Sequence, residues 1–179
     1  MAVTDKKRRL FFALWPSVQV RESIVETVNP LLHEIAGRTI LPKNLHITLH
    51  YIGSVNDDKK DCLHEAAQSI IADPFELSLD RFGHFSKAKI FWMAVQKLPP
   101  ELSRLHQNLG KALSVCDFHS DHRPYSPHVS LLRNYKGRSI DYPEFSIKWH
   151  VDEFVLVESC SAADGVNYKV IERYLMQDK

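Results

Sequence analysis

A histidine followed two residues later by a hydroxyl residue occurs twice in this chain, each time inside an apolar run. The first copy pairs His46 with Thr48, and the second, 82 residues later, pairs His128 with Ser130. Successive side chains of a strand point to opposite faces, so each histidine shares a face with its hydroxyl partner while the apolar residues point into a core. Two such strands facing each other across a cleft supply an acid, a base and hydrogen-bond donors. That combination suits chemistry at a phosphate group.

The remaining sequence alternates between predicted strands and amphipathic helices. Besides the second histidine run, strands are predicted at residues 9–15, 45–52, 75–82, 89–96, 151–159 and 167–175, and helices at 17–37, 57–72 and 99–115. Pro30 is expected to kink or end the first helix, Gly53 to close the first histidine strand, and Gly165 to form a turn with the preceding Asp. Because the motif recurs after nearly half the chain, we expect an α+β fold of two similar lobes related by a pseudo-two-fold axis.

Length and charge limit the class of protein. With 179 residues, of which 44% are hydrophobic, the chain can bury a sizeable core, and we expect a single two-lobed domain over residues 1–179. The formal net charge is +1, which excludes a global positive field for gripping long nucleic acid. A small phosphorylated ligand or the end of an RNA fits this charge better. No obligate protein partner and no membrane contact are indicated, and a monomer is expected.

The cysteines and the N-terminal segment bear on the cellular compartment. Cys62, Cys116 and Cys160 are widely spaced and odd in number, without a CxxC pattern, and are interpreted as reduced thiols in a reducing compartment. The apolar run at residues 10–15 is too short for a secretory signal or for crossing a bilayer. We therefore expect a cytoplasmic protein.

Three segments carry a family resemblance: RLFFAL at residues 9–14, NLHITL at 44–49 and RPYSPHVSLLR at 123–133. With them, the chain resembles the two-histidine phosphoesterase superfamily, and within it the RNA 2′,3′-cyclic phosphodiesterases, historically named 2′–5′ RNA ligases. The resemblance runs from about residue 8 to 177. It implies a bilobal fold in which two antiparallel sheets line a central cleft, with helices packed outside. It also implies hydrolysis of RNA 2′,3′-cyclic phosphate ends to a 2′-phosphate without a metal or cofactor, with 2′–5′ ligation as the reverse reaction.

The resemblance assigns roles to five residues. His46 and His128 match the catalytic histidines, and Thr48, Ser130 and Arg133 match residues that hold phosphate oxygens. Ser130 departs from the usual threonine but keeps the hydroxyl donor. The resemblance favours His46 as the acid at O3′ and His128 as the base, although the sequence itself leaves the order open. Because imidazole has an ordinary pKa near 6.5, we expect one neutral and one protonated ring and a bell-shaped pH profile.

Arg133 conflicts with simple strand alternation, which puts it on the face opposite His128. A β-bulge or the end of the strand is needed to turn it toward the phosphate. Next to the second motif, Tyr125 and Arg123 are predicted to contact the base or another part of the substrate. Phe85 and Trp92 could also stack on a base, but aromatic residues in strands usually belong to the core.

Other residues allow alternative interpretations. His50 is expected on the face of His46, and His119 and His122 are spaced like ligands in a loop. A zinc site needs three or four ligands of defined spacing, commonly including cysteine or carboxylate, and no such set is evident, so we expect no metal. The basic residues 6–9 could steer RNA or form an ordinary solvated terminus.

Two functions of different class remain open. The leading hypothesis is a metal-independent phosphodiesterase acting on RNA ends or small oligonucleotides with a 2′,3′-cyclic phosphate. The alternative is a non-catalytic module that binds nucleotides or RNA ends. Since binding alone does not demand two histidines, His46 and His128 together favour the enzyme.

Overall fold

A computed structural model describes residues 7–121, 123–137, 142–162 and 165–177. The α-helices are α1 (Val18–Val28), α2 (Asp57–Gln68) and α3 (Pro100–Leu113), and the 3-10 helices are η1 (Asn29–His33), η2 (Pro42–Asn44) and η3 (Ser114–Cys116). The strands are β1 (Arg8–Leu14), β2 (Arg38–Thr39), β3 (Ile47–Val55), β4 (Phe75–Leu79), β5 (Arg81–Phe85), β6 (Ile90–Ala94), β7 (His128–Arg133), β8 (Ile147–Val151), β9 (Glu153–Ala162) and β10 (Gly165–Leu175).

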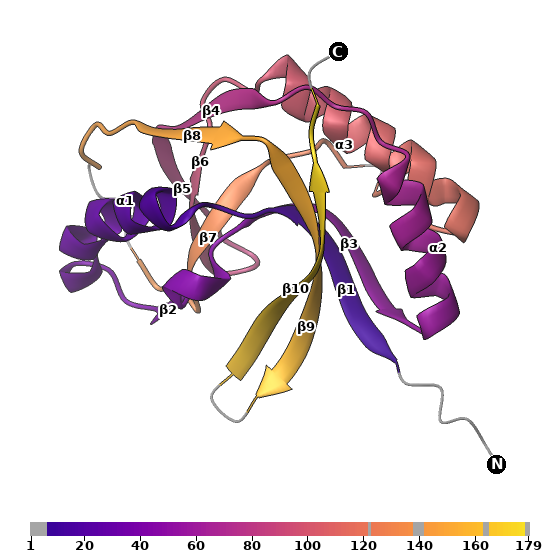
Figure 1. Cartoon of the computed structure of the whole chain (residues 1–179). Helices are drawn as coiled ribbons and strands as arrows, with labels where there is room; N and C mark the ends of the chain where they lie inside the picture. The colour runs from indigo at the N-terminus through magenta and orange to yellow at the C-terminus, as the bar shows by residue number, and fades with distance from the viewer. Residues whose placement is uncertain (1–6, 122, 138–141, 163–164, 178–179) are drawn as a thin grey trace.

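The strands form two antiparallel sheets, so the predicted α+β class is confirmed. The larger sheet has the order β10-β9-β1-β3-β7-β6-β5, with β2 paired to β7, and the smaller consists of β4 and β8. In Figure 1, α2 and α3 lie together on one side of the molecule and α1 lies on the other. The larger sheet is nearly divided at its middle, because β3 and β7 pair at one position, Ile47 opposite Val129. Each half therefore contributes one histidine strand, and the two halves meet at that pair.

Two of the helices begin at a capping side chain. Ser17 begins α1 by accepting a hydrogen bond from Val20 N, and Asn56 begins α2 by accepting one from Lys59 N. α1 ends at Val28 and continues as η1, with Pro30 in its first turn. Because proline has no N–H to donate, a regular α-helix cannot continue undisturbed through this position.

Several strand predictions were wrong in their limits. The predicted strand at residues 75–82 is two strands, β4 and β5, which belong to different sheets. They separate at Asp80, whose N–H donates to Ala94 O and whose carboxylate accepts from Gln96 N. The first histidine strand passes through Gly53, at a φ of 88°, and ends at Val55. Strands β2 and β8 were not predicted, although β8 alternates buried and exposed residues throughout.

The prediction that all three cysteines are reduced thiols was wrong for two of them. Cys62 of α2 and Cys116 of η3 form a disulfide, with their Cα atoms 5.9 Å apart. Cys160 on β9 is a free, exposed thiol. The two bonded residues are separated by 54 positions in the chain, and it is the packing of α2 against α3 and η3 that brings them together. Their spacing in the sequence carried no sign of this.

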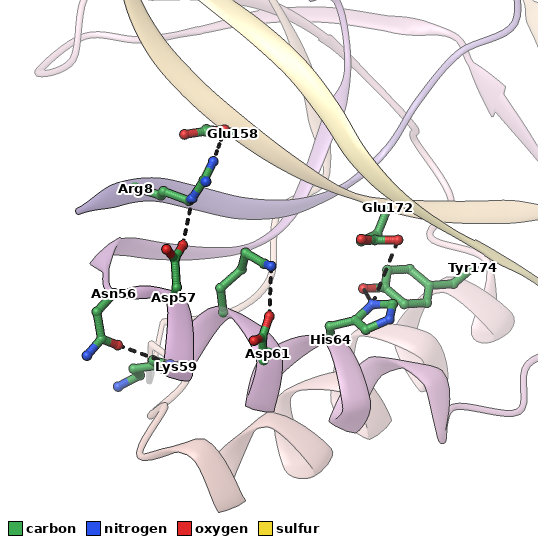
Figure 2. A network of polar contacts seen from close by, with 10 residues as sticks. Arg8, Asn56, Asp57, Lys59, Asp61, His64, Glu158, Glu172 and Tyr174 are labelled. Atoms are coloured by element: carbon green, nitrogen blue, oxygen red, sulfur yellow. Dashed lines mark hydrogen bonds and ion pairs between the residues drawn. The ribbon is translucent and has the colours of Figure 1, made fainter. Parts of the chain in front are cut away.

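The basic start of the chain is tied into the fold. The guanidinium of Arg8 lies 2.9 Å from Asp57 on α2 and 2.9 Å from Glu158 on β9, as Figure 2 shows. Both carboxylates raise the pKa of Arg8 and offset its charge. Arg8 is therefore a structural link rather than a free charge that steers RNA, and Lys6 lies outside the described residues. None of the helices seen in the described residues is long and apolar enough to cross a membrane.

Candidate active site

The pairing of β3 with β7 brings the two histidine motifs together. Ile47 and Val129 are fully buried and lie opposite each other. In an antiparallel register centred on that pair, His46 lies across from Ser130 and Thr48 lies across from His128. Because neighbouring side chains alternate between faces, all four residues project away from the core that Ile47 and Val129 enter. The pseudo-two-fold axis that relates the two motifs therefore passes through the buried pair Ile47 and Val129.

The two histidine rings are held by the same kind of hydrogen bond. His46 Nδ1 donates to Asn44 O at 2.7 Å, and His128 Nδ1 donates to Ser126 O at 2.8 Å. A carbonyl oxygen only accepts, so the neutral rings carry their hydrogen on Nδ1 and leave a lone pair on Nε2. His46 Nε2 lies 3.2 Å from Thr48 Oγ1. Nε2 is therefore the atom of each ring that can accept a proton, and at His46 it accepts a hydrogen bond from the Thr48 hydroxyl.

The surroundings of His46 are aromatic. Its ring centroid lies 4.9 Å from that of Phe11, 5.6 Å from that of Trp15 and 5.2 Å from that of Tyr168, with Trp15 stacked nearly parallel. The pKa of His46 is lowered to about 4, mainly by burial; the hydrogen bond to Asn44 O opposes this shift, and the positive charges of His128 and Arg133 add to it.

His128 occupies a different environment. The rings of His128 and Phe85 pack edge to face, with their centroids 4.9 Å apart. Burial lowers the pKa of His128 as well. Desolvation therefore disfavours the cation at both histidines, and the presence of one protonated ring stays a prediction.

A β-bulge on β7 resolves the position of Arg133. Trp92 of β6 lies opposite Ser130 and Phe91 lies opposite Leu132, so Leu131 is an extra residue without a partner on β6. Leu131 and Leu132 are consequently both buried, and Arg133 returns to the face of Ser130. Of the two alternatives, a bulge or the end of the strand, the structure shows the bulge, and Arg133 lines the same cavity as His46.

The cleft contains two adjoining cavities. The smaller, of about 210 Å³, is lined by His46, Thr48, Ser130 and Arg133 together with Phe11, Ile40, Asn44, Tyr51, Ser159 and Tyr168. The larger, of about 700 Å³, is lined by His128, by His106 and by residues of the ranges 48–51, 85–88, 118–121 and 123–126. Thr48 and Tyr51 line both cavities. The predicted phosphate-binding residues thus gather in the smaller cavity, and His128 stands at the larger one.

Tyr125 and Arg123 both line the larger cavity. The Tyr125 hydroxyl donates to Thr48 O at 3.1 Å, and its ring stacks on His106 with centroids 3.8 Å apart. Tyr125 therefore also anchors the segment before β7 to β3. Arg123 is exposed and forms an ion pair with Asp121.

The histidines of the metal alternative do not gather into a site. His50 is 5% exposed, and its Nε2 donates to His106 O at 2.8 Å. Its predicted position on the face of His46 was wrong, because a bulge at Leu49 turns it to the opposite face. His119 is exposed, and His122 lies outside the described residues. Within the part of the chain that the structure describes, no three His, Cys, Asp or Glu side chains are placed to hold a metal ion.

Comparison with known proteins places the chain in a family. The model of the 2′-5′ RNA ligase superfamily matches residues 20–160. The chain belongs to this superfamily. The RNA 2′,3′-cyclic phosphodiesterase of Escherichia coli (strain K12) is 29% identical over 173 residues, 96% of this chain and 98% of the relative. The RNA 2′,3′-cyclic phosphodiesterase of Archaeoglobus fulgidus is 30% identical over 127 residues, 67% of this chain and 71% of the relative. The crystal structure of E. coli LigT complexed with 3′-AMP has a TM-score of 0.89 and 29% identity, covering 97% of this chain and 100% of LigT.

In this member of the 2′-5′ RNA ligase superfamily, sequence reasoning missed the residues that shape the smaller cavity. Tyr168 reaches the cavity from β10 and Phe11 from β1, and each contacts the ring of His46. Asn44 is 6% exposed, and its side chain donates to Val166 O. Asn44 could have been found from its place directly before the first motif. No signal in the sequence pointed to Tyr168, which lies more than one hundred residues from His46.

Proposed function

We propose that this protein hydrolyses 2′,3′-cyclic phosphate ends of RNA to a 2′-phosphate, using His46 and His128 as acid and base without a metal ion. The observation that carries this proposal is the matched pair of rings. Each donates Nδ1–H to a carbonyl two residues upstream, keeps its lone pair on Nε2, and lines a cleft that also holds hydroxyl and guanidinium donors. The names of the E. coli and A. fulgidus relatives support the same substrate.

The reaction needs one base and one acid. Water attacks phosphorus while its proton passes to the base, and the bond from phosphorus to O3′ breaks as the acid protonates O3′. With His128 as base and His46 as acid, the product keeps its phosphate on O2′. Thr48, Ser130 and Arg133 hold the non-bridging oxygens and stabilise the charge that develops on them. The same steps with an RNA 5′-hydroxyl in place of water as the nucleophile form a 2′–5′ phosphodiester and release O3′, which accounts for 2′–5′ ligation at the same site.

The lowered pKa values of His46 and His128 fit a site in which the acid becomes protonated when the substrate binds. A neutral imidazole with a free Nε2 is ready to act as a base. The acid must first gain a proton, and a phosphodiester anion in the smaller cavity raises the pKa of the ring beside it because opposite charges attract. Protonation is thus coupled to occupation of the cavity by an anion.

The test is turnover of RNA ending in a 2′,3′-cyclic phosphate in the presence of EDTA. We expect wild-type turnover with a 2′-monophosphate product, and a loss of roughly 10²- to 10⁴-fold in rate for His46→Ala and for His128→Ala. His33→Ala, at an exposed histidine of η1, is the matched control and should keep the wild-type rate.

Each other outcome identifies a different error. Near-normal rates in either active-site variant would refute the acid–base roles. A 3′-monophosphate product would reverse the leaving group, and loss of activity in EDTA alone would restore the metal alternative. Binding of the RNA end without any turnover would support the non-catalytic binding module.

A further inference from the structure

The larger cavity provides more space than the proposed reaction at the phosphate requires. The residues assigned to the phosphate lie in the smaller cavity of about 210 Å³, whereas the larger one has about 700 Å³. It begins at His128 and extends between the turn that joins β5 to β6 and the segment before β7. Because Thr48 and Tyr51 line both cavities, a chain molecule held at the phosphate site can continue into the larger cavity without a break.

The charge of the larger cavity favours a polyanion. Lys87, in the turn between β5 and β6, is exposed and forms no ion pair with any residue in the described ranges. Arg123, which also lines this cavity, is paired with Asp121. Lys87 lines the same cavity as His128. In a chain whose net charge is +1, this lysine gives the cavity a local positive charge, which suits one backbone phosphate rather than a long duplex.

The apolar part of the wall favours exposed bases. Phe85 is partly buried and packs edge to face against His128, and Tyr125 and Phe118 line the same cavity. Aromatic side chains bind single-stranded nucleic acid because every base has a face that can stack on them. In a duplex those faces are already covered by neighbouring bases.

We infer that the larger cavity binds the single-stranded RNA immediately 5′ of the terminal cyclic nucleotide, with Lys87 contacting a backbone phosphate and Phe85 contacting a base. This inference rests on the proposed function, since it takes the cyclic phosphate to lie between His46 and His128. It makes the preferred substrate an oligonucleotide end rather than a cyclic mononucleotide. Lys87 and Phe85 become residues that determine this preference.

The experiment compares two substrates that share the same reacting group. One is adenosine 2′,3′-cyclic phosphate, and the other is an unstructured five-nucleotide RNA ending in the same cyclic nucleotide. For the wild type, we expect kcat/KM to be at least about tenfold higher for the oligonucleotide. Lys87→Ala should lower kcat/KM for the oligonucleotide about three- to tenfold, leave the mononucleotide unchanged, and flatten the log–log salt dependence by about 0.7.

Lys97→Ala is the matched control, because Lys97 is exposed and lines neither cavity. Equal kcat/KM of the wild type for the two substrates, or equal losses on both in Lys87→Ala, would overturn the inference while leaving the proposed function intact. A failure of both substrates to turn over would instead refute the proposed function.

A binding measurement keeps the inference testable in that case. The anisotropy of the same RNA labelled at its 5′ end gives a dissociation constant without turnover. We expect Lys87→Ala and Phe85→Leu each to weaken binding at least about threefold, and Lys97→Ala to leave it unchanged. Wild-type affinity in both cavity variants would overturn the inference.

Discussion

The burial of His46 predicts a specific dependence of stability on pH. The pKa of this ring is lowered from 6.5 to about 4, mainly because Phe11, Trp15 and Tyr168 exclude water from it. Since the lowered value belongs to the folded state, the unfolded chain takes up the proton first as the pH falls. Folding therefore loses stability as the pH drops through 6.5, and the loss is complete below about 4.

The size of the effect follows from the two pKa values. Each pKa unit corresponds to about 1.36 kcal/mol, so the full penalty for charging His46 is about 3 kcal/mol. At pH 7.5 both states are neutral and the penalty is absent. At pH 5.0 the unfolded ring is mostly protonated while the folded ring is mostly neutral, which lowers the free energy of unfolding by about 2 kcal/mol.

The assay is urea unfolding at pH 7.5 and at pH 5.0 for the wild type, His46→Asn and His33→Asn. His46→Asn should lose about 2 kcal/mol less than the wild type between the two pH values, because asparagine does not titrate. His33→Asn, at an exposed position, should retain the wild-type difference. His106, whose pKa burial also lowers to about 4, contributes in the same direction to all three proteins and cancels from the comparison.

Identical pH dependence in the wild type and His46→Asn would show that His46 is solvated in solution, and the argument from the aromatic surroundings would fail. The same free energy has a catalytic meaning. An anionic substrate must supply about 3 kcal/mol of favourable interaction to raise the pKa of His46 from about 4 to its ordinary value of 6.5.

Two further predictions concern Ser130 and the disulfide. Ser130→Thr should change kcat less than about threefold, because it keeps the hydroxyl and adds a methyl group that restricts χ1. Ser130→Ala, which removes the hydroxyl, should lower kcat at least about tenfold. Equal rates in both variants would show that Ser130 does not bind the phosphate. Replacing Cys62 and Cys116 together by serine should lower the free energy of unfolding by about 4 kcal/mol, because the bond closes a loop across 54 positions. Cys160→Ser serves as its control in denaturant unfolding, and an unchanged midpoint in the double variant would contradict the stabilising role.

The sequence predicted burial at the histidine motifs better than it predicted the strand boundaries. The alternation of apolar and polar residues at each histidine motif was a local pattern, and it correctly placed Ile47 and Val129 in the core. The sequence also indicated an irregularity before Arg133, because strict alternation along the strand puts Arg133 on the face opposite His128. By contrast, the break between β4 and β5 depends on Asp80 bonding to residues of β6 and to the segment that follows it. Such contacts are absent from any local window of sequence.

What the sequence determined by itself was the chemistry available: two imidazoles, each with a hydroxyl on its own strand face. Tertiary structure decided the electrostatics of those imidazoles, since Trp15, Phe11 and Tyr168 come from strands or segments far from His46 in the chain and together lower its pKa. It also decided the disulfide and the two cavities, because both depend on distances between distant segments. Side-chain alternation is a property of neighbouring residues, whereas desolvation and shape are properties of everything packed around them.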